Sequence, residues 1–455
     1  MRKLLDKYNR PVPRYTSYPT VPEWNNTYDP RDYRRALQAA GKKPETALSV
    51  YMHIPFCRRR CHFCGCTTLV PNKREVVSRY LEALEREVDH IAAFLGRRRE
   101  VVQLHWGGGT PTFLREDEME RLHSLIARRF GFVDGAEMAV EINPHVTGQS
   151  QVRLLRRLGF NRISLGVQDF SPDVQKAIGR GQTFTETAAM YRLLHELGFT
   201  GINFDLVYGL PRQTPAAFAE TIDRVIDLRP DRIAVYSFAY LPALRNHQRA
   251  IKPSDLPTAA EKLALFAHAV ERLTEAGYIQ IGMDHFALPE DELSRALAKR
   301  SLHRNFMGYT TRPADDMIGL GMSAISDLAG NYAQNEARLE AYIEAITGGK
   351  LATYRGCRLS DDDLLRRRVI TYFMCNLVLP FGLLNREFGL EYHDYFAAED
   401  RRLQQFVDDG LLIRKSDRLE VTVSGRTFIR NMAAVFDSYL ERRKNGPRPT
   451  YSKSV

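Results

Sequence analysis

Six short apolar segments, separated by helical stretches, constrain the fold of this chain more than any other feature. Each segment is rich in β-branched or aromatic residues and ends in Gly, Pro or a polar residue, as strands do. They are LSVYMHIPF (48–56), VVQLHWGGGTPT (101–112), EMAVEINPH (137–145), NRISLGVQDF (161–170), GINFDLVYGLP (201–211) and DRIAVYSFAYLP (231–242). Amphipathic stretches such as 76–95 and 185–199 lie between most of them. Because strands that alternate with helices form parallel βαβ units, we predict an α/β fold with a full or partial (β/α) barrel.

The carboxyl ends of these strands carry residues suited to binding a ligand, and in (β/α) barrels the working residues gather at that edge. Glycines let the backbone approach a ligand closely, and acidic or amide side chains bind hydroxyl and amine groups. A single strand-end Gly or Asp is typical of a turn or a helix cap, but five such strand ends indicate one shared site. They carry GGGTP (107–111), Glu141, Gln168 with Asp169, Asp205 and Ala239.

Four of the six cysteines lie within ten positions, in the loop after the first predicted strand. Cys57, Cys61, Cys64 and Cys66 have the spacing C-x-x-x-C-x-x-C-x-C. A structural zinc site usually takes two C-x-x-C pairs from separate stretches, whereas three thiolates can hold a cubane iron–sulfur cluster with one iron left open. Cys66 follows Cys64 too closely to be a good fourth ligand, and its role stays open.

The composition narrows the classes of protein to which the chain can belong. Six cysteines in 455 residues are too few for a disulfide scaffold, and residues 1–15 contain no apolar segment typical of a signal peptide. We therefore expect a cytoplasmic protein with reduced thiols, and the lack of any run of about 18 apolar residues predicts no membrane span. The formal charge of +10 favours acidic partners such as nucleic acid, phosphate or a polycarboxylate, although a basic solvated surface explains it equally well.

The pattern changes from about residue 350. Two helical stretches, 361–379 and 427–444, flank two strand-like segments, 410–415 and 418–423, which predicts a mainly helical, winged-helix-like domain. Winged helices often bind DNA and the tail 442–455 is basic, so DNA binding is an alternative function of this domain. We predict three parts: an N-terminal arm (1–46), the barrel (47–348) and the C-terminal helical domain (349–455).

The cysteine loop resembles the signature of the radical S-adenosylmethionine (SAM) enzymes, in which three thiolates hold a 4Fe-4S cluster and SAM binds the fourth iron. As in that signature, an aromatic residue, Phe63, precedes the third cysteine. Further segments make the chain similar to one family of these enzymes, the oxygen-independent coproporphyrinogen III oxidases. The similarity runs from about residue 8 to 440 and is weaker at 241–260 and in the C-terminal part. The segments are PRYTSYPT (13–20), YMHIPFCRRRCHFCGC (51–66), HWGGGTPT (105–112), GVQDF (166–170), FDLVYGLP (204–211), IGMDHFA (281–287), HRNFMGYTT (303–311) and GMSAIS (321–326).

The resemblance implies the cofactors and the residues that bind them. The 4Fe-4S cluster would be held by Cys57, Cys61 and Cys64, and two SAM molecules would bind beside it. The first SAM would contact Tyr51, Gly108, Glu141 and Ile325. The second would contact Phe63, Gly109, Thr110, Gln168, Arg180, Asp205 and Ala239. Cys66 and Asp284, the latter after a seventh strand-like segment, are candidates for a catalytic role; without the resemblance, Arg180 would be interpreted as a surface arginine.

The resemblance also implies a reaction. Two propionates of coproporphyrinogen III would be oxidatively decarboxylated to vinyl groups without oxygen, giving protoporphyrinogen IX in heme biosynthesis by way of a 5'-deoxyadenosyl radical. The expected partners are this substrate and a one-electron donor such as flavodoxin or ferredoxin, but no nucleic acid, and the chain is expected to act as a monomer. The arm and the C-terminal domain would close over the substrate. Candidates for contacts to its propionates are Arg14, Arg60 and Arg304.

Two alternative functions come from related proteins. A heme chaperone shares the three cluster cysteines, but it typically lacks a cysteine at the position of Cys66 and lacks the arm segment 13–20. A radical enzyme that opens or methylates heme shares the motifs of the superfamily, and sequence motifs separate it poorly from an oxidase.

Overall fold

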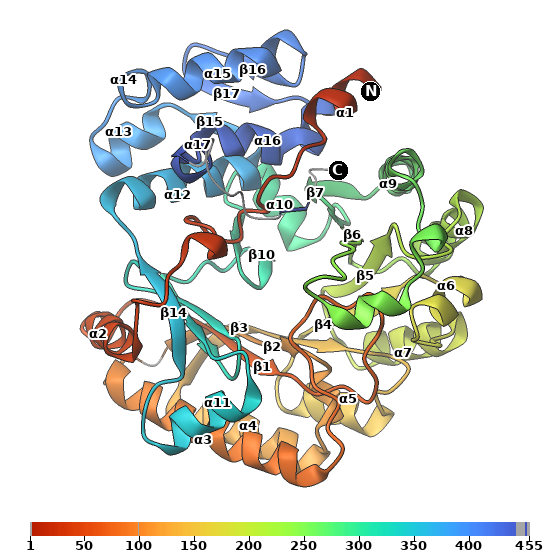
Figure 1. The fold of residues 1–455 in the computed structure, drawn as a ribbon, viewed down its shortest axis with the longest axis vertical. Helices are drawn as coiled ribbons and strands as arrows, with labels where there is room; N and C mark the ends of the chain where they lie inside the picture. The colour runs from red at the N-terminus through yellow and green to blue at the C-terminus, as the bar shows by residue number, and fades with distance from the viewer. Residues whose placement is uncertain (1, 99, 443–450, 453–455) are drawn as a thin grey trace.

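The computed structural model describes residues 2–98, 100–442 and 451–452. A large lower body built on one sheet joins a smaller upper group of C-terminal elements (Figure 1). The N-terminal arm runs from the upper group, where α1 (Arg2–Tyr8) lies, down to the lower body, where α2 (Pro30–Ala40) lies. In the part of the chain that the structure describes, no helix is long and apolar enough to cross a membrane.

The lower body contains a twelve-stranded sheet in the order β14-β13-β12-β11-β1-β2-β3-β4-β5-β6-β8-β7. The neighbouring strands from β11 to β6 pair in parallel, and the six strands predicted from the sequence are all among them. Within the described residues the outer strands β14 and β7 do not pair with each other, so the barrel is partial and the predicted fold class is confirmed. The parallel strands are β1 (Leu48–Ile54), β2 (Glu100–Gly108), β3 (Gly131–Ile142), β4 (Arg162–Gln168), β5 (Ile202–Tyr208), β6 (Arg232–Ser237) and β11 (Asp316–Leu320).

Helices cover the outside of this sheet because each buries one apolar side. On α3, for example, Val77, Leu84 and Val88 are fully buried in the core that the strands share, and each such burial stabilises the fold by roughly 1.5–3 kcal/mol. Thr183 and Thr258 begin α7 and α9 by accepting hydrogen bonds from backbone N–H groups of the first turn. The helices are α3 (Arg74–Leu95), α4 (Glu116–Arg129), α5 (Gln149–Arg157), α6 (Pro172–Ala177), α7 (Phe184–Glu196), α8 (Pro215–Leu228), α9 (Ala259–Glu275), α10 (Glu292–Ala298) and α11 (Leu339–Thr347).

Both edges of the sheet are antiparallel. Beyond β11 lie β12 (Ile325–Leu328), β13 (Asn331–Asn335) and β14 (Thr353–Arg358), so the sheet continues past residue 348. At the other edge, β8 (His285–Ala287) pairs antiparallel with β6, and β7 (Ile279–Gly282) lies outside it. The strand-like segment before Asp284 is therefore a strand, but an antiparallel edge strand rather than the seventh strand of the barrel. Asp284 lies in the tight turn between β7 and β8, which begins at Met283 with φ 41°.

The C-terminal elements form a second hydrophobic core around a three-stranded antiparallel sheet. The predicted hairpin is confirmed as β16 (Leu412–Arg414) and β17 (Arg418–Val421), and β15 (Val378–Pro380) adds a strand to it. The helices of this region are α12 (Asp361–Asn376), α13 (Gly382–Phe388), α14 (Tyr392–Tyr395), α15 (Ala397–Asp408), α16 (Ile429–Ala433) and α17 (Ser438–Arg442).

Two helices of this region differ from their predicted extents. The first, expected at 361–379, ends at Asn376 because Leu377 takes a left-handed conformation with φ 56°, after which β15 begins. The second, expected at 427–444, is interrupted at Asp437. The carboxylate of Asp437 accepts hydrogen bonds from the N–H groups of Tyr439 and Leu440 at 2.9 and 3.1 Å, so it caps a new helix instead of continuing the old one. Residues 443 and 444 lie outside the described residues.

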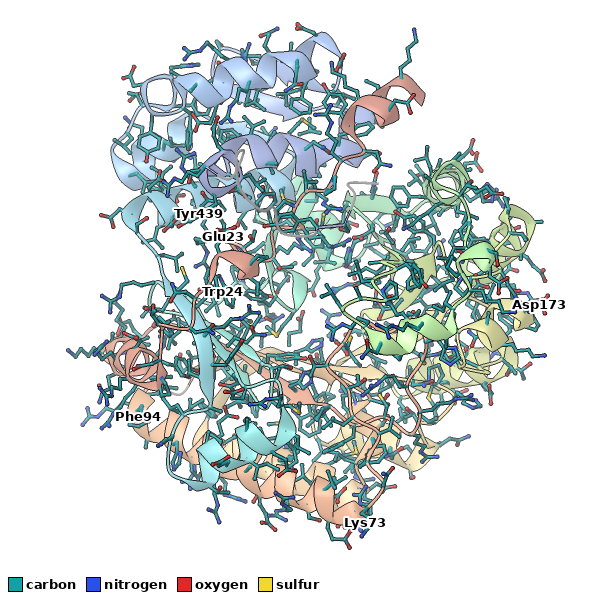
Figure 2. The ribbon with its side chains drawn as sticks, viewed as in Figure 1. Glu23, Trp24, Lys73, Phe94, Asp173 and Tyr439 are labelled. Carbon is teal, nitrogen blue, oxygen red and sulfur yellow. The ribbon has the colours of Figure 1, made fainter. Side chains whose placement is uncertain are left out.

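The N-terminal arm is packed between the two bodies rather than exposed to solvent. The ring of Tyr8 stacks on Phe406 of α15 with the centroids 4.8 Å apart, and Trp24 stacks on Tyr332 of β13 at 5.0 Å. Figure 2 places Trp24 and Tyr439 in this junction. The arm therefore joins the C-terminal elements to the barrel.

Candidate active site

The cysteine loop follows β1 and is closed at its base by backbone hydrogen bonds. The N–H of Cys57 donates to the carbonyl of Leu69 at 2.9 Å, and the N–H of Leu69 donates to the carbonyl of Pro55 at 2.7 Å. The end of β2 is bonded to the same base, because the N–H of Thr110 donates to the carbonyl of Phe56 at 2.9 Å. The loop therefore lies at the edge of the sheet where the glycine-rich segment ends.

The three predicted ligands are half-buried thiols, whereas Cys66 is exposed. The Sγ of Cys57 lies 3.6 Å from the hydroxyl of Thr110, and the guanidinium of Arg180 donates toward the Sγ of Cys61 at 3.9 Å. Burial raises the pKa of Cys57 to about 11. The loop thus gathers its thiols among two of the residues that the resemblance assigns to SAM.

The pKa of Cys64 is lowered, in contrast to that of Cys57. A hydrogen bond from the thiol of Cys66 lowers the pKa of Cys64 to about 6, against the effect of burial, and the positive charges of Arg245 and Arg60 act in the same direction. A thiolate is the form that binds iron, so this environment favours Cys64 as a ligand.

The chemistry of this donor set fits an iron–sulfur cluster better than zinc. Among the described residues, no three His, Cys, Asp or Glu side chains converge closely enough to hold a single metal ion. A tetrahedral zinc site requires that convergence. The thiolates of a cubane cluster each bind a different iron, so Cys57, Cys61 and Cys64 need only surround a space.

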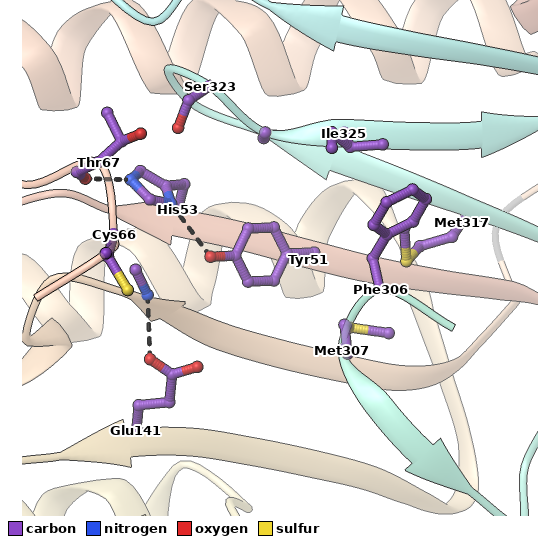
Figure 3. A pocket seen from close by; sticks show the side chains of 13 residues that line it. Tyr51, His53, Cys66, Thr67, Glu141, Phe306, Met307, Met317, Ser323 and Ile325 are labelled. Carbon is purple, nitrogen blue, oxygen red and sulfur yellow. Dashed lines mark hydrogen bonds between the residues drawn. The ribbon is translucent and has the colours of Figure 1, made fainter. Parts of the chain in front are cut away.

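A cavity of about 320 Å³ opens beside the loop (Figure 3). All four residues predicted to contact the first SAM line it, and they come from four different strands or strand ends. Figure 3 shows the ring of Tyr51 in the middle of the lining residues, with Cys66 and Glu141 toward one end and Phe306 and Met307 toward the other. The lining residues are Tyr51, His53, Gly65, Cys66, Thr67, Gly108, Glu141, Phe306, Met307, Met317, Ser323, Ala324 and Ile325.

A short hydrogen-bonded chain fixes Tyr51 in this cavity. The Nε2 of His53 lies 2.9 Å from the carbonyl of Thr67, which can only accept, so Nε2 carries the hydrogen. The Nδ1 of His53 therefore accepts the hydroxyl hydrogen of Tyr51, 3.0 Å away. Burial lowers the pKa of His53, which keeps the ring neutral and this arrangement intact. Sequence reasoning did not single out His53.

Glu141 is held as a carboxylate. The N–H of Gly108 and the Nε2 of His105 donate to its two oxygens, each at 3.1 Å. Burial acts to raise the pKa of Glu141, but the hydrogen bonds from His105 and from the N–H of Gly108 act against it, and the pKa lies below its usual range. A Cβ at Gly107 would lie 2.6 Å from a carboxylate oxygen of Glu141, so a side chain there would displace this carboxylate. The Glu141 side chain is still 41% exposed to the cavity, which leaves an acceptor for an ammonium or hydroxyl group of a ligand.

The residues assigned to the second SAM fall into two groups, of which the first adjoins the loop. The N–H of Gly109 donates to the carbonyl of Ile54 at 2.8 Å. The amide of Gln248 donates to the carbonyls of Phe63 and Ala239 at 3.2 and 3.1 Å, which joins the cysteine loop to the end of β6. Sequence reasoning missed Gln248, because it lies at 241–260 where the similarity to the family is weak.

In the second group, Gln168 ends β4 and Arg180 follows α6, whereas Asp205, expected at a strand end, lies in the middle of β5. A Cβ at Gly166 would meet the amide of Gln168 at 2.7 Å and the guanidinium of Arg180 at 2.9 Å, so the absence of a side chain there makes room for both. Arg180 donates to the carbonyl of Gly166 at 2.5 Å and to the amide oxygen of Gln182 at 2.9 Å. Arg180 is thus half-buried at the rim and is not a surface arginine.

Asp205 faces a second cavity of about 140 Å³, which shares Glu141 and Met307 with the first. The hydroxyl of Ser164 and the amide of Asn203 donate to its carboxylate at 2.7 and 2.8 Å. Burial raises the pKa of Asp205 to about 6 in spite of these bonds. Of the residues assigned to the second SAM, Asp205 is the one that lines this second cavity; the other six line neither of the two cavities.

Asp284, a catalytic candidate, is buried and lies outside both of these cavities. It forms an ion pair with Arg14 of the arm and accepts a hydrogen bond from the Nδ1 of His285 at 2.9 Å. Burial acts to raise the pKa of Asp284, but Arg14 and His285 outweigh it and hold the pKa far below its usual range. Asp284 therefore stays ionised and cannot supply a proton, although it does connect the arm to His285, which lines the second cavity.

Comparison with known proteins decides the family. The model of the radical SAM superfamily matches residues 51–225, and the model of the HemN C-terminal domain matches residues 359–428. A Synechocystis protein named oxygen-independent coproporphyrinogen III oxidase is 44% identical over 445 residues, which cover 97% of this chain and 95% of the relative. The chain belongs to the oxygen-independent coproporphyrinogen III oxidase family. The oxidase of Escherichia coli K12 is 42% identical, with the same two coverages.

The oxidase family also accounts for the fold. A solved structure described as coproporphyrinogen III oxidase (HemN) from Escherichia coli, a radical SAM enzyme, superposes with a TM-score of 0.91 at 40% identity and covers 96% of this chain and 99% of its own. The predictions of family, fold class and enzyme class are confirmed, and a radical SAM enzyme of this family uses a 4Fe-4S cluster and SAM. The heme chaperone, the heme-modifying enzyme and the DNA-binding domain are not favoured.

Proposed function

We propose that this chain converts coproporphyrinogen III to protoporphyrinogen IX in heme biosynthesis, without oxygen, by decarboxylating two propionates to vinyl groups. For each propionate, the β-carbon loses a hydrogen atom, the carboxylate leaves as CO2 and one electron passes to an acceptor. The cluster and SAM, when bound, supply the radical that breaks the unactivated C–H bond, which no side chain can do. The observation that carries the proposal is that the four residues assigned to the first SAM line one cavity together with residues 65–67 of the cysteine loop, in a chain 44% identical to a named oxidase.

The side chains have separate tasks in this proposal. Cys57, Cys61 and Cys64 hold the cluster, and the ionised Glu141 accepts hydrogen bonds from the first SAM. The remaining assigned residues hold a second SAM: Phe63, Gly109, Thr110, Gln168, Arg180, Asp205 and Ala239. Apolar side chains of Phe306, Met307 and Met317 line the first cavity and exclude water from the reacting carbon. Cys66 and Asp284 remain candidates for a catalytic role, Asp284 as a fixed anion.

The electron donor, the oligomeric state and the cellular location are proposed from the same family resemblance. We propose a one-electron donor such as flavodoxin or ferredoxin, a monomeric enzyme and a cytoplasmic location, where the ligand thiols stay reduced. The arm (1–46), the barrel (47–348) and the C-terminal domain (349–455) are proposed as three functional parts. The packing of the arm between the other two supports its role in closing the substrate site.

An anaerobic assay tests this function. Reconstituted protein, reduced with dithionite and supplied with SAM and coproporphyrinogen III, should release two CO2 per porphyrinogen, and a three-carboxylate intermediate should appear first. Heme should remain intact. The Cys61→Ser variant, carried through the same reconstitution, is the matched control and should release no CO2. Tight heme binding without CO2 release would show that the chain is a heme chaperone and not an oxidase.

A further inference from the structure

Two segments with exposed basic side chains lie on or against the cysteine loop. One is residues 58–60 of the loop, and the other is residues 243–252, which include the short helix η3 (Asn246–Ala250). The Nε2 of His247 donates to the carbonyl of Cys64 at 2.7 Å and the amide of Gln248 donates to that of Phe63, so residues 243–252 are held against the same loop that carries residues 58–60 (Figure 1). We call residues 58–60 and 243–252 together the basic patch.

The basic patch carries positive charge that its own residues do not neutralise. The stretches 58–70 and 243–252 contain no Asp or Glu, and among the residues that the structure describes no side chain of the patch forms an ion pair. An apolar side chain, Leu244, is 70% exposed within the patch. None of its residues lines the cavity beside Tyr51. The basic side chains are Arg58, Arg59, Arg60, Arg245, Arg249 and Lys252.

A solvated basic surface without a partner is the ordinary explanation of such charges. Two observations argue against it here. Exposed Leu244 among the cations gives the patch the mixed apolar and charged character of a binding surface. The position of residues 58–60 between the cluster ligands Cys57 and Cys61 also places the positive charge over the part of the protein that must receive an electron.

We propose that the basic patch is the docking site of a small acidic protein that delivers one electron to the cluster. The proposal rests on the proposed function, since radical formation from SAM consumes one electron from the reduced cluster. Electron transfer weakens steeply with distance, so a carrier must bind close to the cysteine loop. Complementary charge speeds such encounters, and electron-transfer interfaces are among the smallest protein interfaces, so a patch of this size suffices.

The test compares the anaerobic turnover rate of the holoenzyme with two reductants, of which only one has to dock on the protein. Reduced flavodoxin is an acidic protein, whereas dithionite is a small ion that needs no docking surface. In the Arg58→Glu/Arg59→Glu variant, the flavodoxin-driven rate at low salt should fall roughly tenfold or more while the dithionite-driven rate stays within about twofold of wild type. Raising the salt should slow the flavodoxin-driven rate of the wild type but not that of the variant.

A second variant and a matched control complete the test. Arg249→Glu/Lys252→Glu leaves the cysteine loop unchanged and should show the same selective loss. Arg31→Glu/Lys43→Glu makes the same change of charge at exposed residues on and just after α2, away from the patch, and should leave both rates unchanged.

Three outcomes would overturn the docking site. They are an unchanged flavodoxin-driven rate in both patch variants, an equal loss with both reductants, and wild-type turnover with dithionite but none with reduced flavodoxin. Absence of CO2 with either reductant in the wild type would instead refute the proposed function.

Discussion

On the cavity side of the cysteine loop, polar side chains are bonded to one another, whereas on its outer side charged side chains face solvent. Facing the cavity, Tyr51 is bonded to His53, and Glu141 is bonded to His105. On the outer surface, Arg58 is exposed and makes no described ion pair. Polar side chains on the cavity side are thus hydrogen-bonded to other side chains, whereas Arg58 on the outer side is exposed to water.

The difference shows what each surface is built to do. Satisfied polar groups in a low-dielectric cavity hold one geometry, which is what positioning a cofactor against a carbon atom requires. Unpaired charges cost little free energy in water, and they remain available to steer a partner that binds briefly. Changes on the cavity side should therefore alter chemistry with any reductant, whereas changes on the outer side should alter only delivery of the electron.

The largest effect is expected from replacing the cysteines, because both SAM cleavage and electron delivery require the cluster that they hold. Replacing Cys57, Cys61 or Cys64 with serine should abolish the visible absorption of the 4Fe-4S cluster and the cleavage of SAM, because serine lacks the soft thiolate that iron binds. Iron analysis and absorption spectra of reconstituted variants measure this. The Cys66→Ser variant should keep the cluster, and loss of the cluster there would show that the ligand assignment is wrong.

The next effect should be confined to the cavity side. Asp205→Ala and Arg180→Ala should keep the full iron content but lose product formation by roughly tenfold or more, since a charge-assisted hydrogen bond contributes about 1.5–3 kcal/mol and about 1.4 kcal/mol is tenfold. The loss should be the same with flavodoxin and with dithionite. Asp173→Ala, at an exposed position on α6, is the matched control (Figure 2). Wild-type turnover in the Asp205 and Arg180 variants would remove them from the SAM site.

The barrel and the cavity residues could be predicted because their signals are local and periodic. Each parallel strand is a short apolar run, and the pairing of β3, β4 and β5 alone brings Glu141 and Asp205 into one cavity. Side chains at Gly107 and Gly108 would meet Glu141 and His53, so glycine at these two positions already marked the site. Family resemblance supplied what periodicity could not, such as the rim position of Arg180.

Other features depend on contacts between distant segments, which a sequence pattern does not contain. The break at Asp437 arises because its side chain caps α17 and also accepts the hydroxyl of Tyr15 at 3.0 Å, from the other end of the chain. Gln248 lies in a segment without regular periodicity, and only the fold brings it to Phe63. The pairing of β8 with β6 likewise joins segments far apart in the chain, Arg232–Ala234 and His285–Ala287.

The smallest effect is expected at Glu87 of α3, which lies outside the cavity and binds the turn that carries part of the cavity wall. Its buried carboxylate accepts hydrogen bonds from the N–H of Gly321 at 2.6 Å, the amide of Asn335 at 2.6 Å and the hydroxyl of Tyr342 at 2.7 Å. Gly321 begins the turn that leads to Ile325 in the cavity wall. Glu87 therefore fixes that turn, but it touches no ligand in the proposed function.

The pH dependence of stability tests this support. Burial raises the pKa of Glu87 from 4.5 to about 7, and the three hydrogen bonds offset only part of that rise. Between these values the folded state binds more protons than the unfolded state, so the contribution of Glu87 to the free energy of unfolding falls as the pH rises, by at most roughly 3 kcal/mol. Since Glu87→Gln does not titrate, the stability of wild type relative to this variant, measured by urea unfolding, should decrease from pH 4.5 to 8. Glu82→Gln, at an exposed position on the same helix, should show no such trend. A difference between wild type and Glu87→Gln that stays constant with pH would mean that Glu87 is ionised throughout, and that its three donors, rather than burial, decide its charge.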